Sequence, residues 1–332
     1  MDKKCINCKH YGSAMLACFN PINEGMRVFE PENQSCDGFD AKKVMNKNSK
    51  VTKIIACSDI HIPSLKGIDE LKDILITFLK QCKNIVDKEG SEKVRIVIAG
   101  DIFHQKISIT NESILCANWF FSELDKLCKT FVVIGNHDFL MDNTGRVDSL
   151  SPLFEIGSYK QVYFLDKELD FQSGIYTDEN IAWCLYSSFT GFNTPDIEMH
   201  KEANSTNANA PELYVGLIHG DVNGATTVTN RVTDNGLDPV VFNGCNFVIA
   251  GHIHKRQVIK KDGVNIVYCS SINQKDMGES VNGHGFVLWD VEFADDVEYN
   301  FVDVPNPDGG FYKFEINDIS DIMDDKEELL NY

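Results

Sequence analysis

Seven residues with carboxylate, amide or imidazole side chains lie in five short clusters of the sequence, and each cluster directly follows an apolar run. They are Asp59 and His61, Asp101, Asn136, His219, and His252 and His254. Imidazole and carboxylate ligands together suit manganese, zinc and iron. Asp101 is the natural bridge between two ions. Two ions about 3.5–4 Å apart polarise phosphoryl oxygens and turn bound water into a nucleophile. The pattern therefore predicts a two-metal centre that hydrolyses phosphate esters.

Each cluster taken alone also has a purely structural explanation. A single histidine after a strand is more often a hydrogen-bonded structural residue, and Asp-x-His and Gly-Asp are short patterns. Gly-Asn-His-Asp at 135–138 and Gly-His-Ile-His at 251–254 are much more specific. The glycines beside the clusters let the backbone turn sharply and approach other groups closely. The joint occurrence of the five clusters, in this order, favours the metal centre.

The segments between the first clusters predict the elements that position them. Apolar runs predict strands over 53–57, 94–99 and 131–134. Helical spacing of apolar residues predicts helices over 65–87 and 110–128, the second capped by Thr110. This β-α-β-α-β order predicts parallel strands joined by right-handed crossovers. Because α/β folds place their sites at the carboxyl ends of strands, the clusters are expected to share one crevice.

Beyond residue 160 the predicted strands follow one another more closely and helices become rare. These strands are expected over 162–165, 181–186, 213–218, 246–250, 264–268, 285–291 and 297–302. The two halves together predict a mixed α/β (α+β) fold class, a two-sheet β-sandwich flanked by helices.

With these motifs the sequence resembles the calcineurin-like metallophosphoesterases, whose pattern is D-x-H, G-D, G-N-H-D/E, a lone His and G-H-x-H. The resemblance covers about residues 53–305 and implies the metallophosphoesterase fold. It also implies that one metal ion is held by Asp59, His61, Asp101 and His254, and the other by Asp101, Asn136, His219 and His252. By the same resemblance, His137 is not a ligand but contacts the phosphate and protonates the leaving oxygen.

Two further segments are similar to the nuclease subunit of double-strand-break repair complexes, called SbcD in bacteria. Gly-Asp-Ile-Phe-His ends in His104, and the matching histidine of that family helps to engage the DNA strand. The segment 267–291 resembles a second block of the family through Ser270, Gly278, Glu279 and Gly285, although Cys269 stands where the family usually has glycine. Phage and viral recombination endonuclease subunits look nearest in style. The structural alternatives are a hydrogen-bonded loop histidine and an ordinary hairpin.

The first 40 residues predict a small cysteine-rich module. Cys5 and Cys8 have the spacing of a metal knuckle, and Cys18 and Cys36 complete a set of four thiols. So short a segment buries little core, which favours a structural zinc ion. An iron–sulfur cluster and unligated thiols are the alternatives.

The remaining boundaries follow from composition. Residues 41–52 read as a linker, 53–305 as the metallophosphoesterase catalytic domain, and 306–332 as an acidic C-terminal segment. Full-length relatives carry a capping domain and helices there, so the cap is expected to be reduced or absent. That puts contact with an SMC-like ABC ATPase of the SbcC type in doubt.

Charge and cysteine usage restrict the class of protein. The chain has 332 residues, with 31 Lys+Arg against 50 Asp+Glu and a formal net charge of −19. Such acidity argues against a protein that simply coats nucleic acid, but bound divalent cations can invert the local field. The 11 cysteines, an odd number, predict a reducing compartment. Since no apolar signal segment or membrane span is apparent, we expect a soluble, cytoplasmic protein.

These observations predict a hydrolase, a manganese-dependent DNA exo/endonuclease of DNA repair or recombination, which cleaves phosphodiester bonds with a metal-activated hydroxide. Iron, zinc and magnesium are the alternative ions. The alternative function is a phosphodiesterase or phosphatase that acts on nucleotides or phosphoproteins. A third alternative is a scaffold with a vestigial metal site. DNA is the expected partner, and 65–87 and 109–128 are candidate homodimer surfaces.

Overall fold

The computed structural model describes residues 50–143, 145–306 and 310–311, together with three two-residue strands near the N-terminus. The chain divides into two compact units, Met1–Ser49 and Lys50–Tyr332. In the first unit, β1 (Tyr11–Gly12), β2 (Ala17–Cys18) and β3 (Met26–Arg27) form an antiparallel sheet in that order. The sequence analysis did not predict these strands.

The second unit contains two six-stranded sheets. The first sheet has the order β15-β14-β4-β5-β6-β7 and the second has the order β12-β13-β11-β10-β9-β8. The first consists of β4 (Lys53–Cys57), β5 (Val94–Ala99), β6 (Thr130–Val133), β7 (Val162–Phe164), β14 (Gly285–Asp290) and β15 (Glu298–Asp303). The second consists of β8 (Gly174–Asp178), β9 (Ile181–Tyr186), β10 (Leu213–His219), β11 (Phe247–Gly251), β12 (Gln257–Lys261) and β13 (Val264–Tyr268).

Both sheets are mixed, with parallel strands beside the clusters of polar residues. Strands β4 to β7 are parallel, while β14 pairs antiparallel with β4 and with β15. Strands β9, β10, β11 and β13 are parallel, and β8 and β12 are antiparallel edges. The predicted fold class, two mixed sheets flanked by helices, is therefore confirmed.

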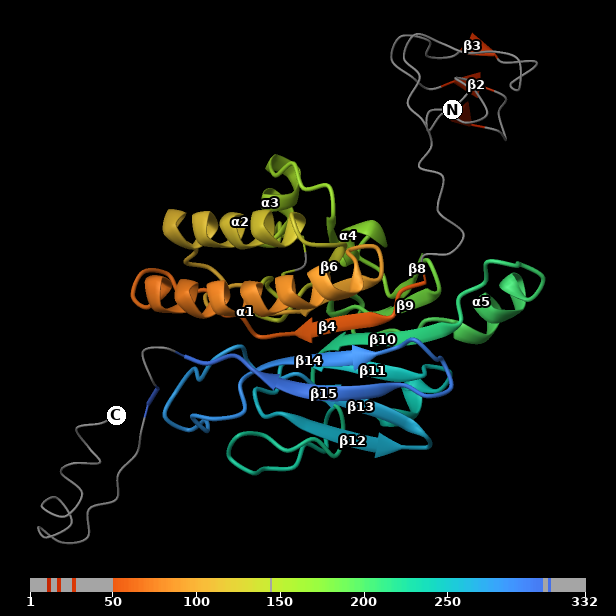
Figure 1. Ribbon diagram of the computed structural model, residues 1–332. Coiled ribbons are helices and arrows are strands. Elements are labelled where there is room, and N and C mark those ends of the chain that lie inside the picture. The colour runs from red at the N-terminus through yellow and green to blue at the C-terminus, as the bar shows by residue number, and fades with distance from the viewer. Residues whose placement is uncertain are drawn as a thin grey trace, which may run out of the picture. The chain divides into compact units, whose positions relative to one another are not determined.

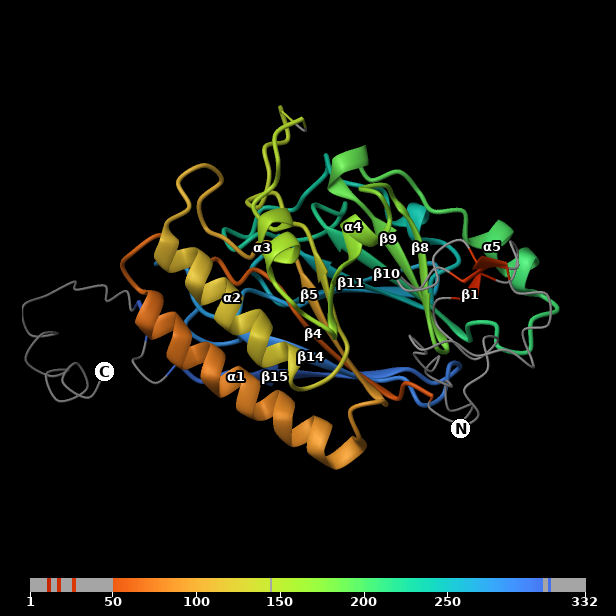
Figure 2. The same cartoon turned by 90° about the horizontal axis from the view of Figure 1, so that it is seen from above.

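The described residues form five α-helices, of which the two longest cover the outer face of the first sheet (Figure 1). They are α1 (Ile68–Glu89), α2 (Asn111–Asp125), α3 (Ser151–Ile156), α4 (Leu165–Glu168) and α5 (Ile197–Asn204), with short 3-10 turns at Ser188–Thr190 and Pro239–Phe242. Helices α1 and α2 lie side by side across the sheet that contains β4 and β5 (Figure 2). Among the described residues, no helix is both long and apolar enough to cross a lipid bilayer.

The residue before each of the two long helices determines where the helix begins. Gly67 has a left-handed backbone (φ 85°), so α1 starts at Ile68 and not at the predicted residue 65. Thr110 caps α2 as predicted: its hydroxyl accepts a hydrogen bond from the backbone N–H of Ser113. Such a cap contributes about 1 kcal/mol.

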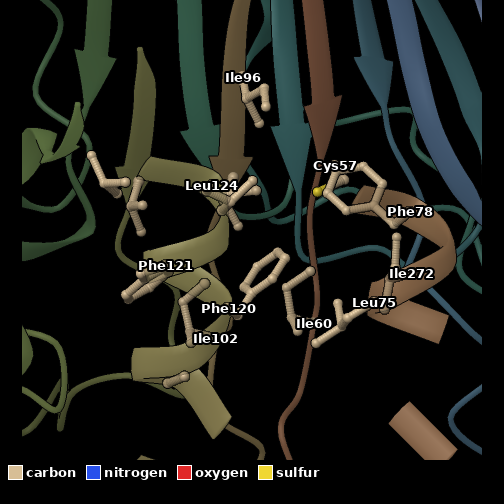
Figure 3. Close-up of a cluster of buried hydrophobic side chains, with 14 of the residues drawn as sticks. Cys57, Ile60, Leu75, Phe78, Ile96, Ile102, Phe120, Phe121, Leu124 and Ile272 are labelled. Carbon is tan, nitrogen blue, oxygen red and sulfur yellow. The ribbon is translucent and has the colours of Figure 1, made fainter. Parts of the chain in front are cut away.

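Apolar side chains fill three layers. One cluster lies between the two sheets and includes Phe131, Trp183 and Trp289. A second joins the first sheet to its helices, where Phe78 of α1 and Phe120 of α2 approach with ring centroids 6.2 Å apart (Figure 3). A third covers the outer face of the second sheet. This packing fixes the strands, and therefore the loops at their carboxyl ends, relative to one another.

Candidate metal centre

The loops after β4 and β5 are hydrogen-bonded to each other. The backbone N–H of Asp59 donates to the carbonyl of Gly100 (3.0 Å), and that of His61 donates to the carbonyl of Asp101 (2.9 Å). The parallel pairing of the two strands thus continues into the loops. Both carboxylates are held on one side of the sheet edge by the backbone, and not only by side-chain contacts.

Four of the seven predicted ligand residues have left-handed backbone, although none is a glycine. The φ angles are 54° at Asp59, 49° at His61, 53° at Asp101 and 93° at His252. Non-glycine residues rarely adopt such angles, and their occurrence concentrates at functional sites, where the surrounding structure holds them in place. The strain turns each side chain out of its strand direction toward the shared crevice.

Glycines make room for these side chains. A Cβ atom at Gly100 (φ 92°) would collide with the imidazole ring of His219, and one at Gly135 would collide with the backbone and carboxylate of Asp101. Both positions therefore require glycine, because the functional groups lie directly against the neighbouring backbone.

One group of donor atoms gathers around His61. Its Nε2 lies 3.1 Å from Nε2 of His254, 3.5 Å from Oδ2 of Asp101 and 3.8 Å from Oδ1 of Asp59. Nε2 of His254 lies 3.5 Å from Oδ1 of Asp59. These atoms are close enough to share one ion.

A second group gathers around His219. Its Nε2 lies 3.2 Å from Oδ2 of Asp101 and 3.2 Å from Oδ1 of Asn136. Nδ1 of His252 lies 2.8 Å from the same oxygen of Asn136. Oδ2 of Asp101 therefore belongs to both groups, and all seven predicted residues converge on one crevice.

In both groups the protonation of the imidazole rings follows from their hydrogen-bond partners. Nδ1 of His254 lies 2.6 Å from Oε1 of Glu279, and Nδ1 of His219 lies 2.7 Å from the carbonyl oxygen of Ala99. Since carboxylate and carbonyl oxygens only accept, both Nδ1 atoms carry a proton. Each Nε2 then faces the other donor atoms and takes up either a second proton or a cation. Imidazole nitrogens and carboxylate oxygens around a shared aspartate fit a pair of divalent ions.

The pKa values follow the same geometry. Burial opposes ionisation of Asp101, but the neighbouring His219 outweighs it and lowers the pKa of Asp101 to about 2. Burial likewise opposes protonation of His219, yet Asp101 raises the pKa of His219 to about 9. Burial lowers the pKa of His61 to about 4. Without a metal ion, His219 thus keeps a second proton beside Asp101, whereas His61 stays neutral.

His137 and His104 lie beside the donor groups. The backbone N–H of His137 donates to Oδ1 of Asp101 (2.7 Å), and Nδ1 of His137 lies 2.7 Å from the carbonyl oxygen of His104. The imidazole rings of His104 and His137 are stacked, with centroids 6.0 Å apart. His104 is exposed and His137 is partly buried, so both rings are accessible from the crevice.

Asp138 ties the loops after β5 and β6 together. Its carboxylate accepts hydrogen bonds from the backbone N–H groups of Ile102, Phe103 and Gly135 at 2.9–3.2 Å. Burial, with the nearby charge of Asp101, raises the pKa of Asp138 to about 7. From the sequence, Asp138 is recognisable only as part of the Gly-Asn-His-Asp motif, and its bonds between the loops are not.

The residues of the crevice differ in their burial. Asp59, Asp101 and His219 are fully buried, whereas His252 and His254 line a hollow of about 470 Å³. The predicted zinc ligands belong to a different unit: Cys5, Cys8 and Cys36, and the side chain of Cys18, lie outside the described residues.

The sequence model of the calcineurin-like phosphoesterases matches residues 52–256, so the chain belongs to this family. Members of the family depend on two metal ions, and the two donor groups agree with that. A nitrogen of His137 also lies within reach of His61 and Asp101, so these three residues form a further potential ligand group.

Among curated proteins, an uncharacterised protein of Acanthamoeba polyphaga mimivirus is 31% identical over 247 residues, which are 74% of this chain but 18% of that protein. The uncharacterised metallophosphoesterase YhaO of Bacillus subtilis is 21% identical over 267 residues, 74% of this chain and 59% of its own length. This chain thus spans less than two thirds of either relative. Among solved structures, a dimetal phosphatase from Danio rerio superposes on this chain with a TM-score of 0.45 and 14% sequence identity. The matched region covers 73% of this chain and 93% of the Danio rerio chain.

Proposed function

We propose that the chain is a two-metal phosphodiesterase, and more particularly an SbcD-type DNA nuclease. The observation that carries the two-metal part is the position of one carboxylate oxygen. Oδ2 of Asp101 lies 3.5 Å from Nε2 of His61 and 3.2 Å from Nε2 of His219. One oxygen within reach of two separate donor groups is the arrangement that a bridged pair of ions requires.

In this proposal each ion has four protein ligands. Asp59, His61, Asp101 and His254 would hold one ion, and Asp101, Asn136, His219 and His252 would hold the other. When bound, the two ions polarise the phosphoryl oxygens and lower the pKa of a water molecule. The buried carboxylates set the charge of the centre, and the half-buried imidazoles form its open side.

His137 is the proposed proton donor to the departing 3′ oxygen. Its Nδ1 is taken up by the carbonyl oxygen of His104, so Nε2 is the nitrogen left to exchange a proton with substrate. The backbone bond from His137 to Asp101 fixes the position of this ring relative to the centre. A positioned histidine of this kind typically contributes about 10²–10⁴-fold to the rate.

The nuclease part of the proposal rests on His104. Its exposed ring stacks on His137, at the rim of the crevice where a strand leading to the scissile phosphate would pass. The Gly-Asp-Ile-Phe-His motif supports the same role. We propose DNA cleavage in repair or recombination on this basis.

A nucleotide phosphodiesterase is the second candidate, and the charge of the hollow favours it. Asp221, Asp234 and Asp276 line the hollow beside His252, and the whole chain carries a formal charge of −19. A long polyanion is repelled by such a surface more strongly than a small nucleotide is.

The test uses the full chain, stripped of metal with a chelator and reloaded with Mn²⁺, Mg²⁺, Zn²⁺ or Fe²⁺ in turn. End-labelled linear duplex, circular single-stranded DNA and 3′,5′-cyclic nucleotides serve as substrates. We expect shortening of the labelled duplex with Mn²⁺, faster than hydrolysis of cyclic nucleotides. Asp101→Asn, which removes the bridging charge, should be inactive on every substrate.

The outcomes separate the two candidates. If the chain hydrolyses cyclic nucleotides but leaves DNA uncut, the nuclease proposal is rejected and the nucleotide phosphodiesterase is retained. Two bound ions without hydrolysis of any of these substrates would reject both.

A further inference from the structure

We propose that Glu279 is a positioning residue for the metal centre: its carboxylate holds His254 in the orientation and tautomer that direct Nε2 toward Asp59 and His61. This inference rests on the proposed two-metal site. Oε1 of Glu279 lies 2.6 Å from Nδ1 of His254, and the side chain of Glu279 is only 2% exposed. Because a carboxylate only accepts, Nδ1 is the protonated nitrogen and Nε2 faces the donor group.

Glu279 cannot hold the same ion directly, because of the side on which it contacts the ring. Its carboxylate binds Nδ1, whereas Nε2 of His254 lies 3.1 Å from Nε2 of His61. An imidazole that uses one nitrogen for the ion and the other for a carboxylate has a fixed plane and a more basic coordinating nitrogen. The role of Glu279 is therefore exerted through His254.

The carboxylate is itself held by its own loop. Oε2 of Glu279 accepts hydrogen bonds from the backbone N–H of Lys275 (2.9 Å) and, more weakly, from the hydroxyl of Ser271 (3.4 Å). The amide of Gln274 donates to the backbone carbonyl of Glu279 (2.9 Å). A side chain with both oxygens engaged has one rotamer available, and this rotamer is the one that meets His254.

The same loop also reaches the chain between the first two predicted ligands. Nζ of Lys275 donates to the backbone carbonyl of Ile60, which stands between Asp59 and His61, at 2.6 Å. The loop from residue 271 to 279 thus contacts His254 on one side of the donor group and the β4 loop on the other. The loop therefore contacts both segments that supply the three donors Asp59, His61 and His254.

In the second donor group, His219 is not held by a side-chain carboxylate in this way. Nδ1 of His219 binds the backbone carbonyl of Ala99, which no side-chain substitution removes. Loss of the Glu279 carboxylate should therefore weaken the ion held with Asp59 and His61, and leave the ion held by Asn136 and His219 in place. This selectivity distinguishes positioning of His254 from a general structural role.

The test compares Mn²⁺ binding to the wild-type full chain, Glu279→Ala and Glu279→Gln, by calorimetry and by electron paramagnetic resonance. We expect the Ala variant to lose about 10–100-fold in affinity at one of two sites. Its spectrum should change from a coupled pair to a single ion at intermediate Mn²⁺ concentration. The isosteric Gln variant keeps an acceptor oxygen and should retain part of the affinity.

Gln274→Ala is the matched control, because it loosens the loop without removing the carboxylate, and it should bind both ions more tightly than Glu279→Ala. The imidazole ¹⁵N shifts of His254 in Zn²⁺-loaded protein report the tautomer directly, and should change in Glu279→Ala. Wild-type affinity at both sites in Glu279→Ala and Glu279→Gln would overturn the inference.

The possible failures are distinguishable. A wild-type chain that binds two ions but hydrolyses no phosphodiester would reject the proposed function, while the selective loss in Glu279→Ala would still support the role of Glu279. A wild-type chain that binds no pair of ions would reject both.

Discussion

His137 is fixed at two points of contact, yet its Nε2 remains free to act on substrate. Because it binds Asp101 only through its backbone N–H, the His137→Ala variant keeps that contact and should retain both ions. We expect kcat on phosphodiester substrates to fall about 10²–10⁴-fold, since the leaving oxygen loses its proton donor. Mn²⁺ stoichiometry, measured on the same preparation, is the control. Wild-type turnover, or loss of an ion, would show that the assigned role is wrong.

The side chain of His104 can be tested separately from His137. It is exposed, and the hydrogen bond to Nδ1 of His137 comes from the backbone carbonyl oxygen of His104. His104→Ser keeps that carbonyl, so hydrolysis of bis-p-nitrophenyl phosphate should remain within about threefold of wild type, below the roughly 10²-fold expected for loss of a proton donor. Digestion from duplex ends should fall much further than nicking within single-stranded loops. An equal loss on all DNA substrates would remove the strand-engaging role.

Residue types and spacing predicted which side chains lie close together, because the motifs stand at the carboxyl ends of neighbouring strands. The partners of those side chains could not be predicted. The bond between Glu279 and His254 spans 25 positions and depends on the path of an irregular loop. The left-handed backbone of Asp59 and Asp101 could not be predicted either, because the sequence indicates such a conformation mainly through glycine.

Among the elements, Asp166 of α4 connects the two halves of the sandwich. Its carboxylate accepts hydrogen bonds from the backbone N–H of Ile134 (2.9 Å) and the hydroxyl of Ser187 (2.7 Å), which follow β6 and β9. Burial raises the pKa of Asp166 to about 6 despite these bonds. The ordinary value is about 3.9 in an unfolded chain, so the folded protein binds this proton more tightly.

Because the pKa of Asp166 is higher in the folded protein than in the unfolded chain, folding is favoured at low pH. Stability contributed by protonated Asp166 is complete below about pH 4 and is lost as pH rises through about 6, a loss on the order of 3 kcal/mol. Asp166→Asn cannot ionise and avoids this loss. Its free energy of unfolding should therefore improve relative to wild type between pH 4.5 and 8. Urea unfolding in the presence of chelator measures the difference, and a difference that does not change with pH would contradict the assignment.

The elements themselves divide into those that the sequence pattern predicts and those that it does not. Buried strands such as β5 and β10 are continuous apolar runs and were predicted within about one residue. The edge strands β8 and β12 were not predicted, because most of their residues are only partly buried and several are polar. The place of β14 beside β4 was also unpredictable, since it depends on contacts between residues more than 200 positions apart.

For the whole molecule, the charge of −19 decides how substrate is attracted. Four acidic side chains and Arg231 line the hollow beside the centre, so the hollow itself offers little positive charge to a DNA backbone. In the proposed function, phosphate would then be bound mainly through the metal pair. Since few Lys and Arg contacts release counterions, the affinity for DNA should depend weakly on salt and strongly on metal.

This dependence can be measured without cleavage by using His137→Ala and fluorescently labelled duplex in an anisotropy titration. At about 0.15 M salt, where the Debye length is about 8 Å, we expect no saturable binding in chelator and clear binding after addition of Mn²⁺. Asp101→Asn, with its bridging charge removed, should fail to recover binding with Mn²⁺. Equal affinity with and without metal would mean that a cationic surface elsewhere on the chain binds the DNA, and that the metal pair serves only the chemical step.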